Sequence, residues 1–155
     1  MVQEKHELAI YSFLDSAVSL IPTEQREKRL NRMVVQFYYL GVIDSLRQSE
    51  ALSIRDFHIL IARTFQRYGI SIRMPVPLYI SKVAEHIQST LWLERAMQIG
   101  AEAFRSFWSH HDTSAPSILA KLIAVIDDSN NEYERFPGRP PFSFQQAPIS
   151  HPPAP

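Results

Sequence analysis

Hydrophobic residues recur at intervals of three and four along most of the chain, a spacing that places them on one face of a helix. The first stripe lies between residues 4 and 21, where Pro22 ends it. Similar stripes occupy five later segments, at about 23–50, 53–69, 78–89, 91–108 and 114–128. The sequence therefore predicts an all-α fold: a compact bundle of about six or seven helices with a Pro-rich extended C-terminal tail.

The second segment is predicted to be one long central helix, capped by Thr23 and running to about Glu50. Its run Phe37-Tyr38-Tyr39-Leu40 is apolar on more than one face, so we expect several neighbours to pack against it. Gly41 costs this helix about 1 kcal/mol relative to alanine. That cost is tolerable if another backbone packs close to the glycine.

Local signals set several boundaries between helices. Ser53 and Asp56 have the spacing of a capping box, and Gly69 is a natural stop for the helix that they begin. Residues 70–77 alternate apolar and polar positions, but their two prolines favour an extended connector over a paired strand. The hydroxyls of Ser89 and Thr90 can cap a new helix, which predicts a break there.

The composition changes after Asp128. Seven of the eleven prolines lie between residues 129 and 155, and hydrophobic residues no longer recur there at intervals of three and four. This divides the chain into a helical domain, 1–128, and an extended or disordered tail, 129–155. Prolines hold a segment in an extended conformation before it binds, and aromatic rings can anchor such a segment to a partner. The tail is therefore a candidate protein-binding element, through Phe136, Arg139, Pro140, Pro141, Phe142 and Phe144. Alternatively, these phenylalanines cover the domain's own apolar surface.

The sequence lacks the residues and motifs that several kinds of enzyme and metal site require. The chain has no cysteine and only four glycines, and it contains no phosphate-binding glycine motif and no nucleophile motif. His110-His111-Asp112 stands at a predicted helix end without the spacing of a metal-binding pair. We expect no enzymatic activity, no cofactor and no metal, although dispersed residues could still assemble a site that sequence motifs do not reveal.

The first fifteen residues contain Glu4, Glu7 and Asp15, which a secretory signal core would exclude. No apolar run approaches the roughly 20 residues that a membrane-spanning helix needs. We therefore expect a cytoplasmic protein without membrane insertion.

The formal net charge is zero, but its distribution is uneven. Residues 26–82 carry ten basic and four acidic side chains, while the segments on either side are acidic. If the second and third helices pack antiparallel, they bring together a possible anion or nucleic-acid patch: Arg26, Lys28, Arg29, Arg32, Arg63, Arg67 and Arg73. Alternatively, acidic helices neutralise these residues locally.

These patterns favour a non-enzymatic cytoplasmic helical protein-interaction module: an adaptor, a chaperone-like partner, an anti-activator or an accessory subunit. The alternative is a nucleic-acid-associated regulator that uses the basic region 26–73. A helix-turn-helix fits poorly, since roughly eight residues separate the candidate helices where about three or four are usual. The sequence does not identify the partner protein and leaves open whether the chain forms a homo-oligomer.

Overall fold

The structure, a computed structural model, describes residues 1–89 and 91–135. These residues form helices and connecting turns without a strand, which confirms the predicted all-α fold. The described helices are α1 (Glu4–Ser19), α2 (Thr23–Arg26), α3 (Arg29–Ser49), α4 (Ile54–Arg67), α5 (Val76–Ser89), α6 (Leu91–His110) and α7 (Ser117–Arg135).

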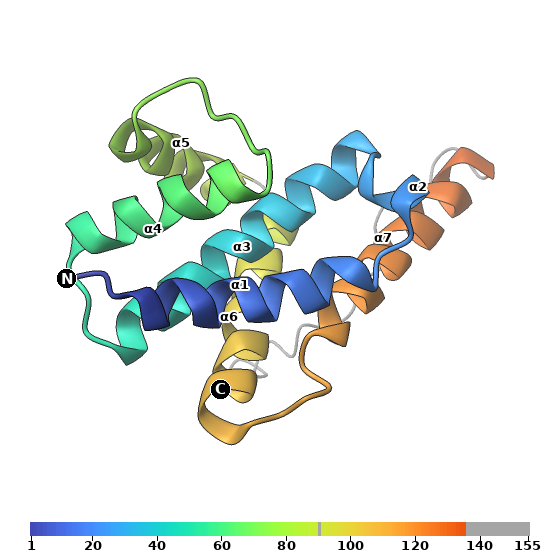
Figure 1. The fold of residues 1–155 in the computed structure, drawn as a ribbon. Helices are drawn as coiled ribbons and strands as arrows, with labels where there is room; N and C mark the ends of the chain where they lie inside the picture. Colours follow the sequence, from blue (N-terminus) through green and yellow to red (C-terminus); the bar gives the residue numbers. More distant parts are fainter. Residues whose placement is uncertain (90, 136–155) are drawn as a thin grey trace, which may run out of the picture.

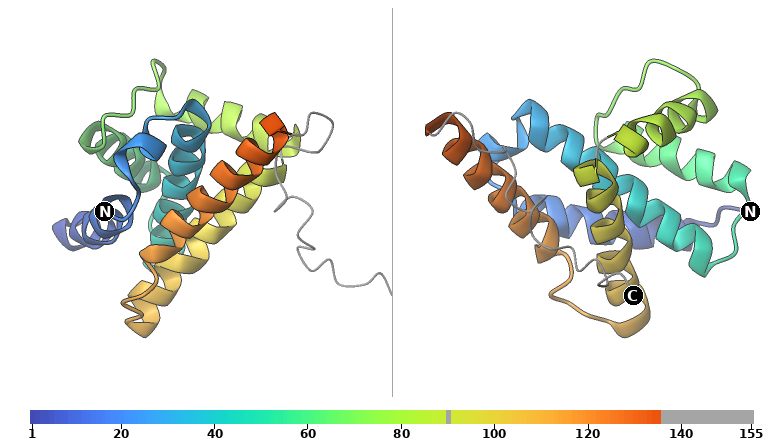
Figure 2. Two further views of the ribbon diagram at one scale, coloured as in Figure 1. Left: turned by 90° about the vertical axis from the view of Figure 1, so that its right-hand side faces the viewer. Right: turned by 180° about the vertical axis from the view of Figure 1, so that it is seen from behind.

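Helices α3 and α6 cross at the centre of the bundle, and their contact is the most extensive between any two described helices (Figure 1). Helices α1 and α7 pack against α3 and against each other, while α5 lies at the edge, against α4 and α6. Figure 2 shows the same arrangement from the side and from behind. The central position of α3 agrees with the apolar run that predicted contact from several neighbours.

Aromatic rings fill the space where α1, α3 and α6 meet. Phe13 of α1 stacks on Tyr38 of α3, with ring centroids 6.3 Å apart, and meets Phe104 of α6 edge-to-face at 5.4 Å. All three side chains are fully buried, and Phe37 is only 5% exposed. Burial of these rings removes much apolar surface from water and so stabilises the crossing of the helices.

The prediction of one continuous helix from Thr23 to Glu50 is wrong, because the chain leaves helical geometry between α2 and α3. Lys28 is extended, with φ −63° and ψ 133°, and Thr23 is the first residue of α2 rather than its cap. The buried Asn31 donates from Nδ2 to the carbonyl oxygen of Gln25 at 2.8 Å. This side-chain bond satisfies a carbonyl at the end of α2 and holds the turn.

The last helix also differs from its prediction, because it continues beyond Asp128 to Arg135. The segment Ser129–Arg135 contains no proline, so nothing in its backbone chemistry ends the helix there. The first proline after α7 is Pro137. Residues 136–155 of the proposed tail lie outside the described residues.

Most local boundary signals are confirmed. Ser53 caps α4 by accepting a hydrogen bond from the backbone nitrogen of Asp56 at 3.1 Å, and the Asp56 carboxylate accepts one from Ser53 in return. Gly69 follows α4 with φ 70°, in the left-handed region that glycine enters without strain. Helix α5 is described to Ser89 and α6 from Leu91. Thr90, where the sequence predicts a break, lies outside the described residues.

Candidate functional site

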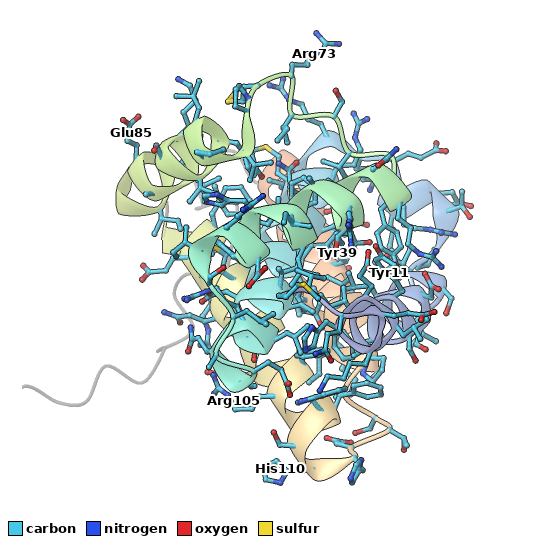
Figure 3. The ribbon with its side chains drawn as sticks, turned by 60° about the vertical axis from the view of Figure 1, so that its left-hand side comes forward. Tyr11, Tyr39, Arg73, Glu85, Arg105 and His110 are labelled. Carbon is cyan, nitrogen blue, oxygen red and sulfur yellow. The ribbon has the colours of Figure 1, made fainter. Side chains whose placement is uncertain are left out.

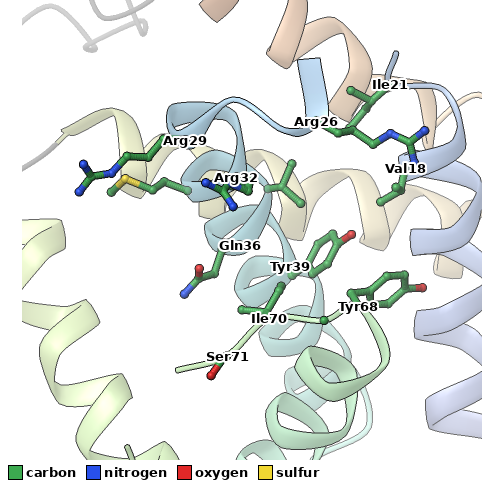
Figure 4. A pocket seen from close by; sticks show the side chains of 13 residues that line it. Val18, Ile21, Arg26, Arg29, Arg32, Gln36, Tyr39, Tyr68, Ile70 and Ser71 are labelled. Atoms are coloured by element: carbon green, nitrogen blue, oxygen red, sulfur yellow. The ribbon is translucent and has the colours of Figure 1, made fainter. Parts of the chain in front are cut away.

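A concave surface with a volume of about 530 Å³ lies where α1 ends, α3 begins and α4 passes into the connector (Figure 4). We call it the basic hollow. Its charged lining consists of Arg26, Arg29 and Arg32, and its walls are largely apolar, including Val18, Ile21 and Ile70. This volume lies in the usual range for ligand-binding pockets, roughly 300–1,000 Å³.

Secondary structure places the three arginines together. Arg26 ends α2, while Arg29 and Arg32 stand three residues apart in the first turn of α3 and therefore share one face of that helix. In Figure 4 the guanidinium groups of Arg29, Arg32 and Arg26 follow one another across the hollow and do not converge on one point. The hollow therefore presents positive charge along a line.

None of these three arginines forms an ion pair with a carboxylate in the described part of the chain. Arg26 donates from Nη2 to the Thr23 hydroxyl at 3.0 Å, and its buried Nε atom has no hydrogen-bond partner among the described residues. The described residues that line the hollow include no aspartate or glutamate. A buried donor without a partner costs free energy that an acceptor from a ligand can recover.

Two tyrosines also line the hollow. Tyr39 and Tyr68 pack edge-to-face, with ring centroids 5.1 Å apart. Burial raises the pKa of Tyr39 far above its usual range, so its hydroxyl stays protonated and can donate a hydrogen bond. Burial and then the hydrogen bond to Asp15 raise the pKa of Tyr68 as well.

Tyr68 is fixed from outside the hollow by α1. Its hydroxyl donates to Oδ1 of Asp15 at 2.6 Å, and Arg67 donates to Oδ2 of the same carboxylate at 3.0 Å. The Arg67 guanidinium also lies over the ring of Tyr11, 4.5 Å from its centroid. These contacts join the end of α4 to α1 and hold one wall of the hollow in place.

The structure brings together only part of the predicted basic patch. The start of α3 does lie near the end of α4, because Tyr68, Ile70 and Ser71 line the same hollow as the three arginines. Three of the other predicted cations form ion pairs instead: Lys28 with Asp127, Arg63 with Glu7 at 3.1 Å, and Arg67 with Asp15. Acidic residues of α1 and α7 thus neutralise cations that the charge count along the sequence assigned to the basic patch.

Arg73, the seventh member, stands apart from the hollow. It is exposed on the connector between α4 and α5, with φ 53°. Figure 3 places it at one end of the molecule, well away from Tyr39, while Arg105 and His110 lie at the opposite end. The predicted patch is therefore reduced to Arg26, Arg29 and Arg32.

The tail residues Phe136, Arg139, Pro140, Pro141, Phe142 and Phe144 lie outside the described residues. Within residues 1–89 and 91–135, no three His, Asp or Glu side chains are grouped so as to hold a metal ion. The same part of the chain contains no helix with the length and apolar character needed to cross a membrane.

Sequence reasoning missed the two tyrosines and the apolar walls of the hollow. Tyr39 belongs to the aromatic run of α3, which predicted burial correctly, since the residue is 2% exposed. Its position beside Arg26 and Tyr68 depends on how three helices pack, and no spacing within one helix encodes that. The cluster of basic residues at 26–32 was the available signal.

Comparison with protein-family models, with curated proteins and with solved structures finds no match to this chain. Its function is therefore argued from the geometry and charge of the basic hollow.

Proposed function

We propose that this chain is a non-enzymatic protein-interaction module that binds an acidic, extended segment of a partner protein in the basic hollow. The observation that carries this proposal is the row of Arg26, Arg29 and Arg32 along a partly apolar hollow, without a carboxylate among the described lining residues. An adaptor or accessory subunit in the cytoplasm would use such a surface to recognise its partner.

The spacing of the arginines favours a segment with several carboxylates over a single phosphate group. One phosphate is held best when guanidinium groups converge on it and donate in pairs. Here the three groups are spread across the hollow, so consecutive acidic residues of an extended chain match them better. Val18 and Ile70, which are half-buried, offer apolar surface to the same ligand.

The alternative function, a nucleic-acid-associated regulator, is less well supported by the charge distribution. Lys28, Arg63 and Arg67 are already paired with carboxylates, so they contribute little net positive potential. Duplex binding depends on several cations that each neutralise a phosphate along an extended surface. Arg26, Arg29 and Arg32 lie in a concavity with apolar walls, which suits a peptide better.

Fluorescence anisotropy with a labelled acidic peptide tests this proposal. The wild-type protein should bind a Glu-rich peptide at least tenfold more tightly than its Gln counterpart at physiological salt, and Arg32→Glu should abolish that preference. Arg105→Glu is the matched control, because Arg105 is exposed at the far end of the molecule. Equal binding of both peptides by the wild type would refute the proposal.

Duplex DNA of random sequence serves as the competing ligand in the same assay. We expect a Kd no tighter than about 10⁻⁵ M at physiological salt, within the non-specific range. Submicromolar, sequence-dependent binding that is lost in the double variant Arg63→Glu, Arg67→Glu would support the nucleic-acid alternative instead.

A further inference from the structure

A second concavity adjoins the basic hollow. It has a volume of about 510 Å³ and lies between α4 and the connector that leads to α5. Its lining includes Phe65, Ile72, Met74 and Val76, and no charged side chain is present among the described lining residues. We call this concavity the apolar hollow.

Gly69, Ile70 and Ser71 line both hollows, so the two concavities lie on either side of this short piece of chain. We call the segment 69–75 the strap. Ile70, Ile72 and Met74 of the strap are half-buried, whereas Ser71 and Arg73 are exposed. The strap therefore turns its apolar side chains inward but leaves part of their surface in contact with water.

The shared segment makes the two hollows neighbours, since both are lined by Gly69, Ile70 and Ser71. Gly69 and Ser71 are exposed, so a ligand can lie across the strap at this point. An extended ligand with acidic residues in the basic hollow would therefore reach the apolar hollow with a neighbouring side chain.

From this arrangement we propose that one ligand segment occupies both hollows, and that it carries a large apolar side chain beside its acidic residues. This inference rests on the proposed function, since the carboxylates must bind Arg26, Arg29 and Arg32. The apolar side chain would cover Ile72 and Met74, whose remaining exposed surface favours contact with an aromatic or branched aliphatic group. The arginines of the basic hollow would bind the acidic residues of the ligand, and the uncharged lining of the apolar hollow would take its apolar side chain.

Three labelled peptides test the proposal by anisotropy against the full chain. Each contains the same acidic segment, followed by phenylalanine, preceded by phenylalanine, or flanked by glutamine at both positions. We expect one of the two phenylalanine peptides to bind about tenfold more tightly than the glutamine peptide. The other should gain much less, because only one end of the acidic segment meets the apolar hollow.

A variant that fills the apolar hollow provides the second arm. Ala62 is exposed on α4 and lines this hollow, so Ala62→Phe should occupy it without disturbing the core. We expect this variant to bind all three peptides with the affinity of the glutamine peptide. Ala124→Phe, at an exposed position of α7, is the matched control and should retain the full tenfold preference.

The outcomes separate the two proposals. If the phenylalanine and glutamine peptides bind equally to the wild type, or if Ala62→Phe keeps the preference, the two-hollow proposal is wrong while acidic binding stands. If no acidic peptide binds more tightly than its uncharged counterpart, the proposed function fails, and the inference that rests on it fails too. Thermal melts of both variants confirm that each is folded before binding is compared.

Discussion

Gly41 of α3 and Gly100 of α6 each lie directly against the backbone of the other helix. A Cβ atom at Gly41 would overlap the carbonyl group of Met97, with the carbonyl carbon 2.8 Å away. A Cβ atom at Gly100 would overlap the carbonyl group of Tyr38, with the carbonyl carbon 3.1 Å away. The absence of these two side chains therefore allows α3 and α6 to cross at backbone contact, and this crossing explains a glycine that is otherwise unfavourable inside a helix.

Gly100→Ala should destabilise the fold by about 3 kcal/mol, because the added methyl group meets helix backbone rather than a flexible side chain. The intrinsic preference of helices for alanine, about 1 kcal/mol, offsets only part of this loss. Urea denaturation followed by circular dichroism measures the change.

Gly69→Ala is the control for this experiment, since nothing lies within 4 Å of a Cβ atom at Gly69. Its cost should be only about 1 kcal/mol, from the left-handed backbone conformation alone. A Gly100→Ala variant as stable as the wild type would show that the two helices are farther apart than described.

Neighbouring aromatic residues of α3 should respond in opposite ways to truncation. Phe37 is 5% exposed, so Phe37→Ala should cost about 3–5 kcal/mol through lost burial and an unfilled cavity. The Tyr38 hydroxyl is buried and finds no hydrogen-bond partner within residues 1–89 and 91–135, so Tyr38→Phe should leave stability unchanged or increase it by about 1 kcal/mol. Thermal and urea melts of the pair measure both effects, and a clearly destabilised Tyr38→Phe variant would mean that this hydroxyl has a partner.

The carboxylate of Asp15 should make stability depend on pH at the acidic end. Burial acts to raise the pKa of Asp15, but hydrogen bonds from Tyr68 and Arg67, together with the Arg67 charge, hold it below its usual value of 3.8. A pKa lowered by folding stabilises the fold fully above the unfolded-state pKa, and this contribution disappears as the pH falls through the folded-state value.

Asp15 is about half exposed, so solvent screening limits its contribution to about 0.5 kcal/mol. Asp15→Asn should therefore lower stability slightly at pH 7 and lose less stability than the wild type between pH 5 and pH 2, as urea melts across that range would show. If the free energy of unfolding changed with pH in the same way for both proteins, Asp15 would have the same pKa in the folded and unfolded states.

The helices were predictable where their signals are local. The Ser53–Asp56 capping box and the stop at Gly69 depend on residues close in sequence, and both lie where expected. The break between α2 and α3 was missed because Asn31 forms it through a bond to the backbone of Gln25, and asparagine at that position has no distinctive pattern.

The candidate site was predictable only in its charge. The basic cluster at 26–32 indicated an anion-binding surface, and the packing of α3 against α4 agrees with the antiparallel arrangement assumed from the sequence. Which cations stay unpaired depends on contacts between distant helices, such as that of Arg63 with Glu7. Such ion pairs join residues that are far apart in the sequence, and a count of charges along the chain does not detect them. The count therefore overestimates the number of unpaired cations in the patch.

The central claim is that Arg29 and Arg32 bind the carboxylates of an acidic partner segment, and a charge exchange tests it most directly. Isothermal titration calorimetry would compare the wild type and the double variant Arg29→Glu, Arg32→Glu, each with a Glu-containing peptide and with the same peptide carrying lysines. Tight binding is expected only for the wild type with the acidic peptide and for the double variant with the lysine peptide. Retention of acidic-peptide binding by the folded double variant would contradict it.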